Sequence, residues 1–176
     1  MAPNWYHLIF EVIDLRSFSN LWFWIALAAL WSSASHRVLG VPFDMIVRAR
    51  REGGAVQADL ETMVRINVDR VLHIAQTSGL WLAGFGCFML TSLILLGFVY
   101  EMEFAQAVFL LLSPMVIVGL LTLRTARKIR AGGETGADLD RRLMRHRMSV
   151  QAVGMAAILV TSMYGMWVNM QLGALG

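Results

Sequence analysis

Four long apolar runs divide the chain, and most charged residues are concentrated in the segments between them. The runs cover residues 20–40, 78–100, 104–123 and 149–170. A helix needs about 20 apolar residues to cross the hydrocarbon core of a bilayer, and each run is about that long. The pattern therefore predicts an all-α integral membrane protein: a four-helix bundle with four transmembrane spans, forming a single domain over residues 1–176.

Shorter features of the pattern refine this prediction. Only Glu101, Met102 and Glu103 separate the second run from the third, so we expect those two spans to form a tight antiparallel hairpin. In the N-terminal segment 1–19, polar and apolar residues fall on opposite faces of a helix. Such a helix is typical of the membrane interface, and we predict an interfacial amphipathic helix there. An amphipathic helix packed on the bundle is the alternative.

The two segments between spans one and two and between spans three and four, 41–77 and 124–148, differ in length. The longer one has room for a helical hairpin, with one arm beginning at Pro42. Its other arm carries an apolar stripe at helical spacing, formed by Leu60, Val64, Val68, Val71 and Ala75. This hairpin would cap the bundle, extend the second span, or offer its stripe to a partner helix.

Basic residues set the predicted orientation. Segment 36–77 holds six of the 15 arginines and lysines, and segment 124–148 holds eight. Cytoplasmic loops carry the excess of Lys and Arg, so both segments are predicted to face the cytoplasm. Both termini and the turn at residues 101–103 would then lie outside. In a Gram-negative bacterium this corresponds to a multi-pass inner-membrane protein with periplasmic termini.

One short phrase occurs twice, as REGGAVQADLE at 51–61 and RAGGETGADLD at 130–140. We expect each glycine pair to cap the helix before it, and each aspartate to lie near the start of the next helix. An internal repeat of two parallel transmembrane hairpins would explain the recurrence. Independent convergence on the same turn chemistry is the alternative. The residues concerned are Gly53, Gly54 and Asp59 in the first copy, and Gly132, Gly133 and Asp138 in the second.

Composition narrows the range of functions. Hydrophobic residues make up 57% of the chain and charged residues 15%, against about 45–50% and 25% in soluble domains. The basic balance could suggest nucleic acid, but the basic residues flank the apolar runs, so we predict no nucleic-acid partner. The cores of the runs contain no ionisable residue, which argues against intramembrane catalysis or proton transfer. A single cysteine, Cys87, leaves no cysteine cluster for a metal. We predict a protein that is not an enzyme and has no cofactor or metal.

Three histidines are weak candidates for binding a cofactor. His36, His73 and His146 all fall near the inner ends of predicted spans. Two histidines on facing helices of a bundle can ligate a haem iron, so they are haem candidates. Each also lies close to arginines at the expected headgroup boundary, where a solvated histidine is the simpler interpretation.

The second inner segment is strongly basic and is the candidate surface for anionic lipid or a partner. Lysines and arginines beside the membrane attract anionic headgroups by about 1 kcal/mol each. Setting the topology is the alternative role for these residues. They are Arg124, Arg127, Lys128, Arg130, Arg141, Arg142, Arg145 and Arg147.

Three segments carry a resemblance to a known group of proteins: FEVIDLRSFSNLWFWIALA, HRVLGVPFDMIVRARR and AQAVFLLLSP. They resemble a group of small four-span alphaproteobacterial inner-membrane proteins that are often labelled a component of the SufBCD iron–sulfur assembly complex. The resemblance extends over most of the chain and brings no catalytic motif. It implies a membrane anchor or partner for a cytoplasmic machine.

The patterns together favour an accessory or scaffold protein of the membrane, which self-associates as a homo-oligomer or binds a larger membrane or cytoplasmic complex. One alternative is a homo-oligomeric channel or transport protein lined by hydroxyl and amide side chains. A second is a membrane electron carrier that binds b-type haem.

Overall fold

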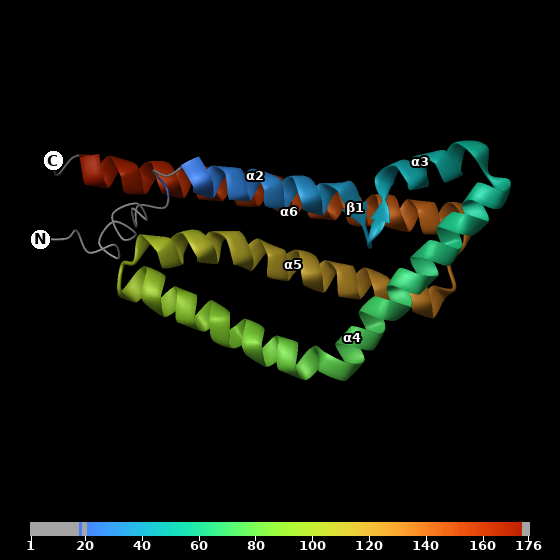
Figure 1. Ribbon diagram of the computed structural model, residues 1–176, viewed down its shortest axis with the longest axis horizontal. Helices are drawn as coiled ribbons and strands as arrows, with labels where there is room; N and C mark the ends of the chain where they lie inside the picture. Colours follow the sequence, from blue (N-terminus) through green and yellow to red (C-terminus); the bar gives the residue numbers. More distant parts are fainter. Residues whose placement is uncertain (1–17, 19–20, 174–176) are drawn as a thin grey trace, which may run out of the picture.

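The computed structural model describes residue 18 and residues 21–173, and within these the chain is almost entirely helical (Figure 1). The fold class predicted from the sequence, all-α, is confirmed. Two very short strands form the exception. In chain order the elements are α2 (Leu21–His36), β1 (Arg37–Val38), β2 (Val41–Pro42), α3 (Phe43–Glu52), α4 (Gly54–Ile94), the π-helical segment η2 (Leu95–Val99), α5 (Glu103–Gly132) and α6 (Gly136–Gly173).

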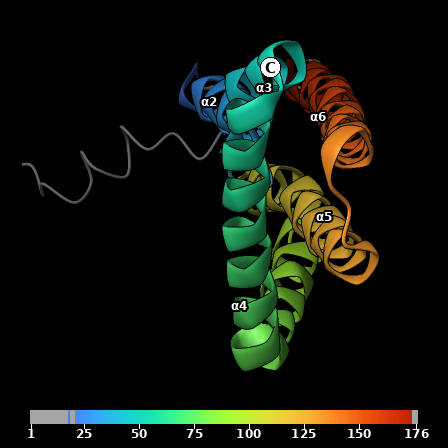
Figure 2. The same cartoon turned by 90° about the vertical axis from the view of Figure 1, so that its right-hand side faces the viewer.

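The long helices lie side by side in an order that differs from their order in the chain. α6 lies between α2 and α5, and the second half of α4 packs on the other side of α5 (Figures 1 and 2). The beginning of α2, the turn before α5 and the end of α6 lie together, and we call this the outer end. The opposite or inner end contains α3, the first half of α4 and the α5–α6 turn.

Three of the helices are long and apolar enough to cross a membrane. They are Gly54–Val99, Glu103–Gly132 and Gly136–Gln171. They contain the second, third and fourth predicted spans. Within the described part of the chain, three helices therefore have the length and composition of membrane spans.

The first predicted span, 20–40, extends beyond the end of the helix that the structure shows, α2. α2 has 16 residues and ends at His36, so it is about 24 Å long at 1.5 Å per residue. The chain then turns sharply, because Leu39 and Gly40 have φ angles of 51° and 78° and β1 pairs antiparallel with β2. The helix is shorter than the hydrocarbon core of about 30 Å.

The predicted tight hairpin between spans two and three is present. α4 and η2 lead directly into residues 100–102, and α5 begins at Glu103. The side chain of Gln106 donates a hydrogen bond of 2.7 Å to the carbonyl oxygen of Gly97 in the π-helical turn. Gly97 leaves no room for a side chain there, since a Cβ atom would lie 3.0 Å from the backbone nitrogen of Gln106. Gln106 and Gly97 therefore hold the two helices close together at the outer end.

The predicted inner segment 41–77 is helical over nearly all of its length. α3 begins directly after Pro42, as expected for the first arm of the hairpin. The second arm is the beginning of α4, which continues into the second span and changes direction on the way (Figures 1 and 2). Its first half crosses the inner end of the bundle. The inner hairpin therefore caps the bundle and extends the second span.

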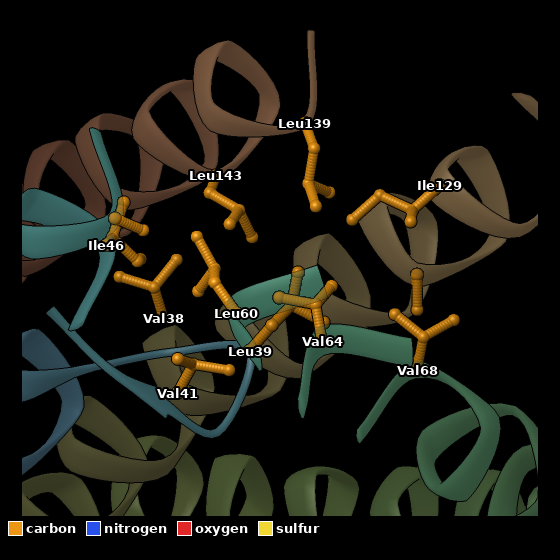
Figure 3. Packing of buried hydrophobic residues seen from close by; sticks show 12 residues of the cluster. Val38, Leu39, Val41, Ile46, Leu60, Val64, Val68, Ile129, Leu139 and Leu143 are labelled. Atoms are coloured by element: carbon orange, nitrogen blue, oxygen red, sulfur yellow. The ribbon is translucent and has the colours of Figure 1, made fainter. Parts of the chain in front are cut away.

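The first three residues of the apolar stripe of α4 are buried within the chain. Leu60, Val64 and Val68 point into the largest hydrophobic cluster of the described residues, where side chains from α3, α5 and α6 meet them (Figure 3). Leu60 and Leu139 lie 79 positions apart, as do Val64 and Leu143, and all four side chains are at most 2% exposed. Leu60, Val64 and Val68 are therefore covered by the protein's own helices, whereas Val71 and Ala75 are only partly buried.

The glycines cap the preceding helices as predicted, whereas only one of the two aspartates lies near the start of a helix. Gly53 (φ 62°) ends α3, and Gly133 (φ 56°, left-handed) ends α5; their amides bond to Ala49 and Ile129 four residues back. Gly132 is still the last residue of α5. Asp138 lies in the first turn of α6 as predicted.

The prediction for Asp59 was wrong, because α4 already begins at Gly54 and has no acidic residue in its first turn. The predicted interfacial helix over residues 1–19 lies outside the described residues except for Phe18. That residue is buried against Gly165 and Tyr164 of α6, and its amide donates to Glu103 Oε1 at 2.7 Å.

Candidate functional site

The eight basic residues predicted to bind lipid or a partner lie on two antiparallel helices at the inner end. The segment 124–148 forms the last turns of α5, the turn at residues 133–135 and the first turns of α6. Because α5 packs against α6, side chains from both helices meet along their common groove. The structure divides the eight residues into three groups according to what each side chain contacts.

Three arginines form ion pairs with carboxylates. Arg142 donates from Nε to both oxygens of Glu134, at 3.1 and 2.9 Å. Arg130 pairs with Asp69 of α4, which connects the end of α5 to the helix that crosses the inner end. The third pair, Arg141 with Asp138 at 3.4 Å, is highly exposed and lies within α6. The pairs of Arg130 and Arg141 are exposed and contribute little to stability, so these two contacts mainly position side chains.

Arg147 has a packing role. Its guanidinium carbon lies 3.3 Å from the centre of the Phe43 ring, a cation–π contact that joins α6 to α3. Its Nε atom is buried and has no hydrogen-bond partner among the described residues. This side chain is therefore committed to the contact between helices.

The remaining basic residues are Arg124, Arg127, Lys128 and Arg145, all exposed and without an ion pair to any carboxylate in the described part of the chain. Three of them line one cavity of about 160 Å³ between α5 and α6, whereas Arg127 does not. We call it the α5–α6 cavity. It is lined by Leu121, Arg124, Thr125, Lys128, Arg142, Arg145, His146 and Ser149.

Hydroxyl and imidazole groups occupy the wall of the α5–α6 cavity. Thr125 Oγ1 lies 3.1 Å from Nδ1 of His146, which is only 6% exposed. Ser149 Oγ donates to the carbonyl oxygen of Arg145 at 3.0 Å. The Ser149 oxygen can also accept a hydrogen bond from a ligand in the cavity, since a hydroxyl has one donor and two acceptor positions. The role left to Thr125 Oγ1 depends on the tautomer of His146.

One carboxylate lies beside this group of cations. The hydrogen bond from Arg142 lowers the pKa of Glu134, and the positive charges of Arg142, Arg145 and Lys128 lower it further. Glu134 is therefore ionised at neutral pH and offsets one of four positive charges. The four cations of the lining, Arg124, Lys128, Arg142 and Arg145, and the adjacent Glu134 together carry a net charge of about three.

The other large cavities at the inner end carry mixed charge. The cavity between α4 and the α5–α6 turn, about 360 Å³, contains Glu61, Asp69 and Glu134 together with Arg65 and Arg130. A second one, about 710 Å³, lies between the end of α2, α3 and α6. Its charged lining residues are Asp44, Glu52, Arg48, Arg51 and Arg147. Of these cavities, the α5–α6 cavity has the strongest excess of one sign.

The three histidines are not gathered into one site. His36 and His146 line different cavities, and His73 is an exposed residue of α4. The His36 ring bonds to the carbonyl oxygen of Ser32 at 3.0 Å, within its own helix. Among the described residues, no group of three or more His, Cys, Asp or Glu side chains is placed to hold a metal ion.

Sequence reasoning missed a contact between the two copies of the repeated phrase. Glu61 of the first copy accepts a hydrogen bond of 2.7 Å from the amide of Gly136, at the start of α6. Gln57 donates to Asp140 at 3.4 Å. The recurrence of the phrase was the only signal in the sequence, and it gave no indication that the two copies touch.

Comparison with known protein families, with curated proteins and with solved structures finds no match.

Proposed function

We propose that this protein is a non-enzymatic integral membrane protein that acts as an accessory or scaffold subunit. The observation that carries the proposal is the large apolar surface left uncovered by a single copy of the chain. Only 11% of the most apolar stretch of the α4 helix is buried. Large apolar side chains of α4 such as Leu80, Trp81 and Phe88 are between 66% and 88% exposed. Lipid or another helix must cover this surface.

Space for a neighbouring helix supports an assembly. A Cβ atom added at Gly79, Gly84 or Gly86 of α4 would meet nothing within 4 Å. Small residues at such positions allow the backbones of transmembrane helices to approach closely. We propose that the membrane half of α4 contributes to self-association or to the contact with a larger complex.

The proposal includes four membrane crossings, with α2 as the shortest. α2 packs along α6, where Trp31 lies against Gly154, and it begins at the outer end, as α5 does. A short span is accommodated by local thinning of the bilayer and by flanking residues that reach the interface. The concentration of Arg and Lys at the inner end supports an orientation with both termini in the periplasm.

A parallel repeat of two hairpins is part of the same proposal. Equivalent positions of the two copies, Leu60 with Leu139 and Val64 with Leu143, share one core and support it. The channel and haem-carrier alternatives stay predictions.

The topology is tested with single cysteines placed in a Cys87→Ala background. Met102 is 45% exposed at the outer end, and Thr135 is exposed in the α5–α6 turn. In intact cells, Met102→Cys should react with a membrane-impermeant maleimide, while Thr135→Cys should react only after the inner membrane is permeabilised. The reverse pattern would contradict the orientation.

The scaffold role is tested by extracting the protein gently from native membranes and measuring the mass of the complex. We expect a homo-oligomer or a complex with specific companions, since the apolar face of α4 is open in the single chain. Substituting Gly84→Leu should reduce the assembly, whereas Met163→Leu, a conservative change at an exposed position of α6, should leave it intact. A lone monomer under several mild detergents would contradict the proposal.

A further inference from the structure

The α5–α6 cavity has the composition of a phosphate-binding site at the level of the lipid headgroups. Arg124 and Lys128 lie one turn apart on α5, and Arg145 faces them from α6. Each of the three is exposed and lacks a carboxylate partner among the described residues. Guanidinium and ammonium groups that converge without a counter-ion favour an anion, and phosphate oxygens are acceptors of the right kind.

The position along α5 indicates where the anion comes from. The helix presents exposed apolar side chains, Ile117 and Leu120, immediately before the cavity begins. Leu121 lines the cavity itself, and Arg124 follows one turn later. The chain therefore passes from a lipid-contacting surface to a cationic cavity within about two helical turns. A phospholipid could place its phosphate in the cavity and its acyl chains against the apolar surface of α5.

The polar wall of the cavity adds specificity. Arg142 is held at the rim by Glu134, so its guanidinium is fixed in orientation before a ligand arrives. The hydroxyl groups of Thr125 and Ser149 are within the lining, and Ser149 Oγ can accept a hydrogen bond from a glycerol hydroxyl group. The volume of about 160 Å³ is several times the roughly 30 Å³ occupied by a water molecule, which is enough for a headgroup of several heavy atoms.

We infer that the α5–α6 cavity binds the phosphate of an anionic phospholipid in the inner leaflet, held by Arg124, Lys128 and Arg145. The site belongs to a single chain and does not depend on the scaffold role. A failure of the scaffold role would therefore leave the lipid site standing, whereas its place in the inner leaflet rests on the proposed orientation. Bound lipid would join α5 to α6 at the membrane boundary and leave the rest of the basic surface accessible from the cytoplasm.

The test uses the full-length protein in nanodiscs made of phosphatidylcholine with a small fraction of phosphatidylglycerol, and native mass spectrometry to count retained lipids. Both lipids carry a phosphate, and only phosphatidylglycerol has a net negative charge. The wild type should retain phosphatidylglycerol preferentially. The triple variant Arg124→Gln, Lys128→Gln, Arg145→Gln should bind it at least about tenfold more weakly, because each lost cation removes an attraction near the surface.

The matched control removes the same charge elsewhere at the inner end. Arg50, Arg70 and Arg127 are exposed arginines outside this cavity. Their triple substitution by glutamine should change the retention less than twofold. An equal loss in both triple variants would show only general attraction to the surface and would overturn the site, as would unchanged retention in the cavity variant.

Two further experiments complete the test. If the triple variant fails to fold, Lys128→Glu is compared with Arg127→Glu; both positions are exposed, and only Lys128 lines the cavity. Only the first change should reduce phosphatidylglycerol retention. The second experiment adds millimolar inorganic phosphate, which should not displace the lipid, because it lacks the acyl chains. Displacement by phosphate alone would show a site for a soluble anion and overturn the lipid assignment.

Discussion

The inner end differs in its packing from the rest of the bundle, where α2, α5, α6 and the second half of α4 run side by side. We call this second region the membrane half. At the inner end, α3, α4, α5 and α6 converge, and twelve buried residues form one continuous cluster (Figure 3). Where the helices run parallel, a second cluster has only three buried residues, Leu27, Trp31 and Ala157. Burial against water drives the packing of the first region, whereas apolar helices in lipid gain little from burying one another.

From this difference in packing we infer different roles for the two regions. A helix that crosses the inner end contacts several partners, so its side chains specify how the others are placed. Along the membrane half, each helix leaves much of its surface to lipid or to another copy. We therefore expect the inner end to set the fold and the membrane half to set the associations, and matched substitutions can separate these effects.

The largest expected effect comes from truncating one leucine of the inner cluster. Leu143 is fully buried on α6, and Leu143→Ala should lower the free energy of unfolding by about 2–5 kcal/mol by leaving a cavity. Leu159, on the same helix, is 61% exposed, and Leu159→Ala should change it by less than about 0.5 kcal/mol. Unfolding in mixed detergent micelles measures both. Equal losses would remove the distinction between the regions.

A medium effect is expected at the tightest contact of the membrane half. A Cβ atom at Gly154 would lie 2.8 Å from the Trp31 ring, so Gly154→Ala should push α2 from α6 and cost about 1–3 kcal/mol. Gly119 on α5 has open space, and Gly119→Ala should be neutral or stabilising by up to about 1 kcal/mol. Cross-linking between cysteines introduced on α2 and α6 reports the separation. An unchanged yield in the first variant would contradict this packing.

The smallest effect is expected from the pair between Glu134 and Arg142. The pKa of Glu134 in the folded protein lies below its ordinary value of 4.5, so its contribution to stability is complete above pH 4.5. This contribution is lost as the pH falls through the lowered pKa. Melting temperatures at descending pH should therefore fall further for the wild type than for Glu134→Gln. Parallel curves for the two proteins would show that the pair contributes nothing.

The sequence predicted the helical class, the tight turn at 101–103, both glycine caps and four spans, three of which lie in long apolar helices. Each of these depends on local properties: apolar length, loop length and the freedom of glycine at positive φ. The end of α2 was misplaced because residues 37–40 are still mostly apolar, and only the pairing of β1 with β2 shows that the helix has stopped. Asp59 was misassigned because a helix start is hard to locate when no side chain caps it.

The candidate site was predicted as a set of eight residues, and the structure was needed to sort it. Charge counting could not show that Arg130 and Arg142 pair with carboxylates or that Arg147 stacks on Phe43. Those partners come from distant positions or from across a turn. The cavity depends on which faces of α5 and α6 meet, and a helical pattern alone does not reveal the angle between two helices.

By itself, the sequence determined which segments are apolar enough for a membrane and where their charged ends lie. These properties follow from the cost of placing charges and unpaired amides in hydrocarbon, a cost that depends on each segment alone. Only the tertiary structure decided that α4 crosses the inner end, that the two copies of the phrase meet there, and which cations remain without a partner. Those features arise from packing between residues far apart in the chain, so no single segment encodes them.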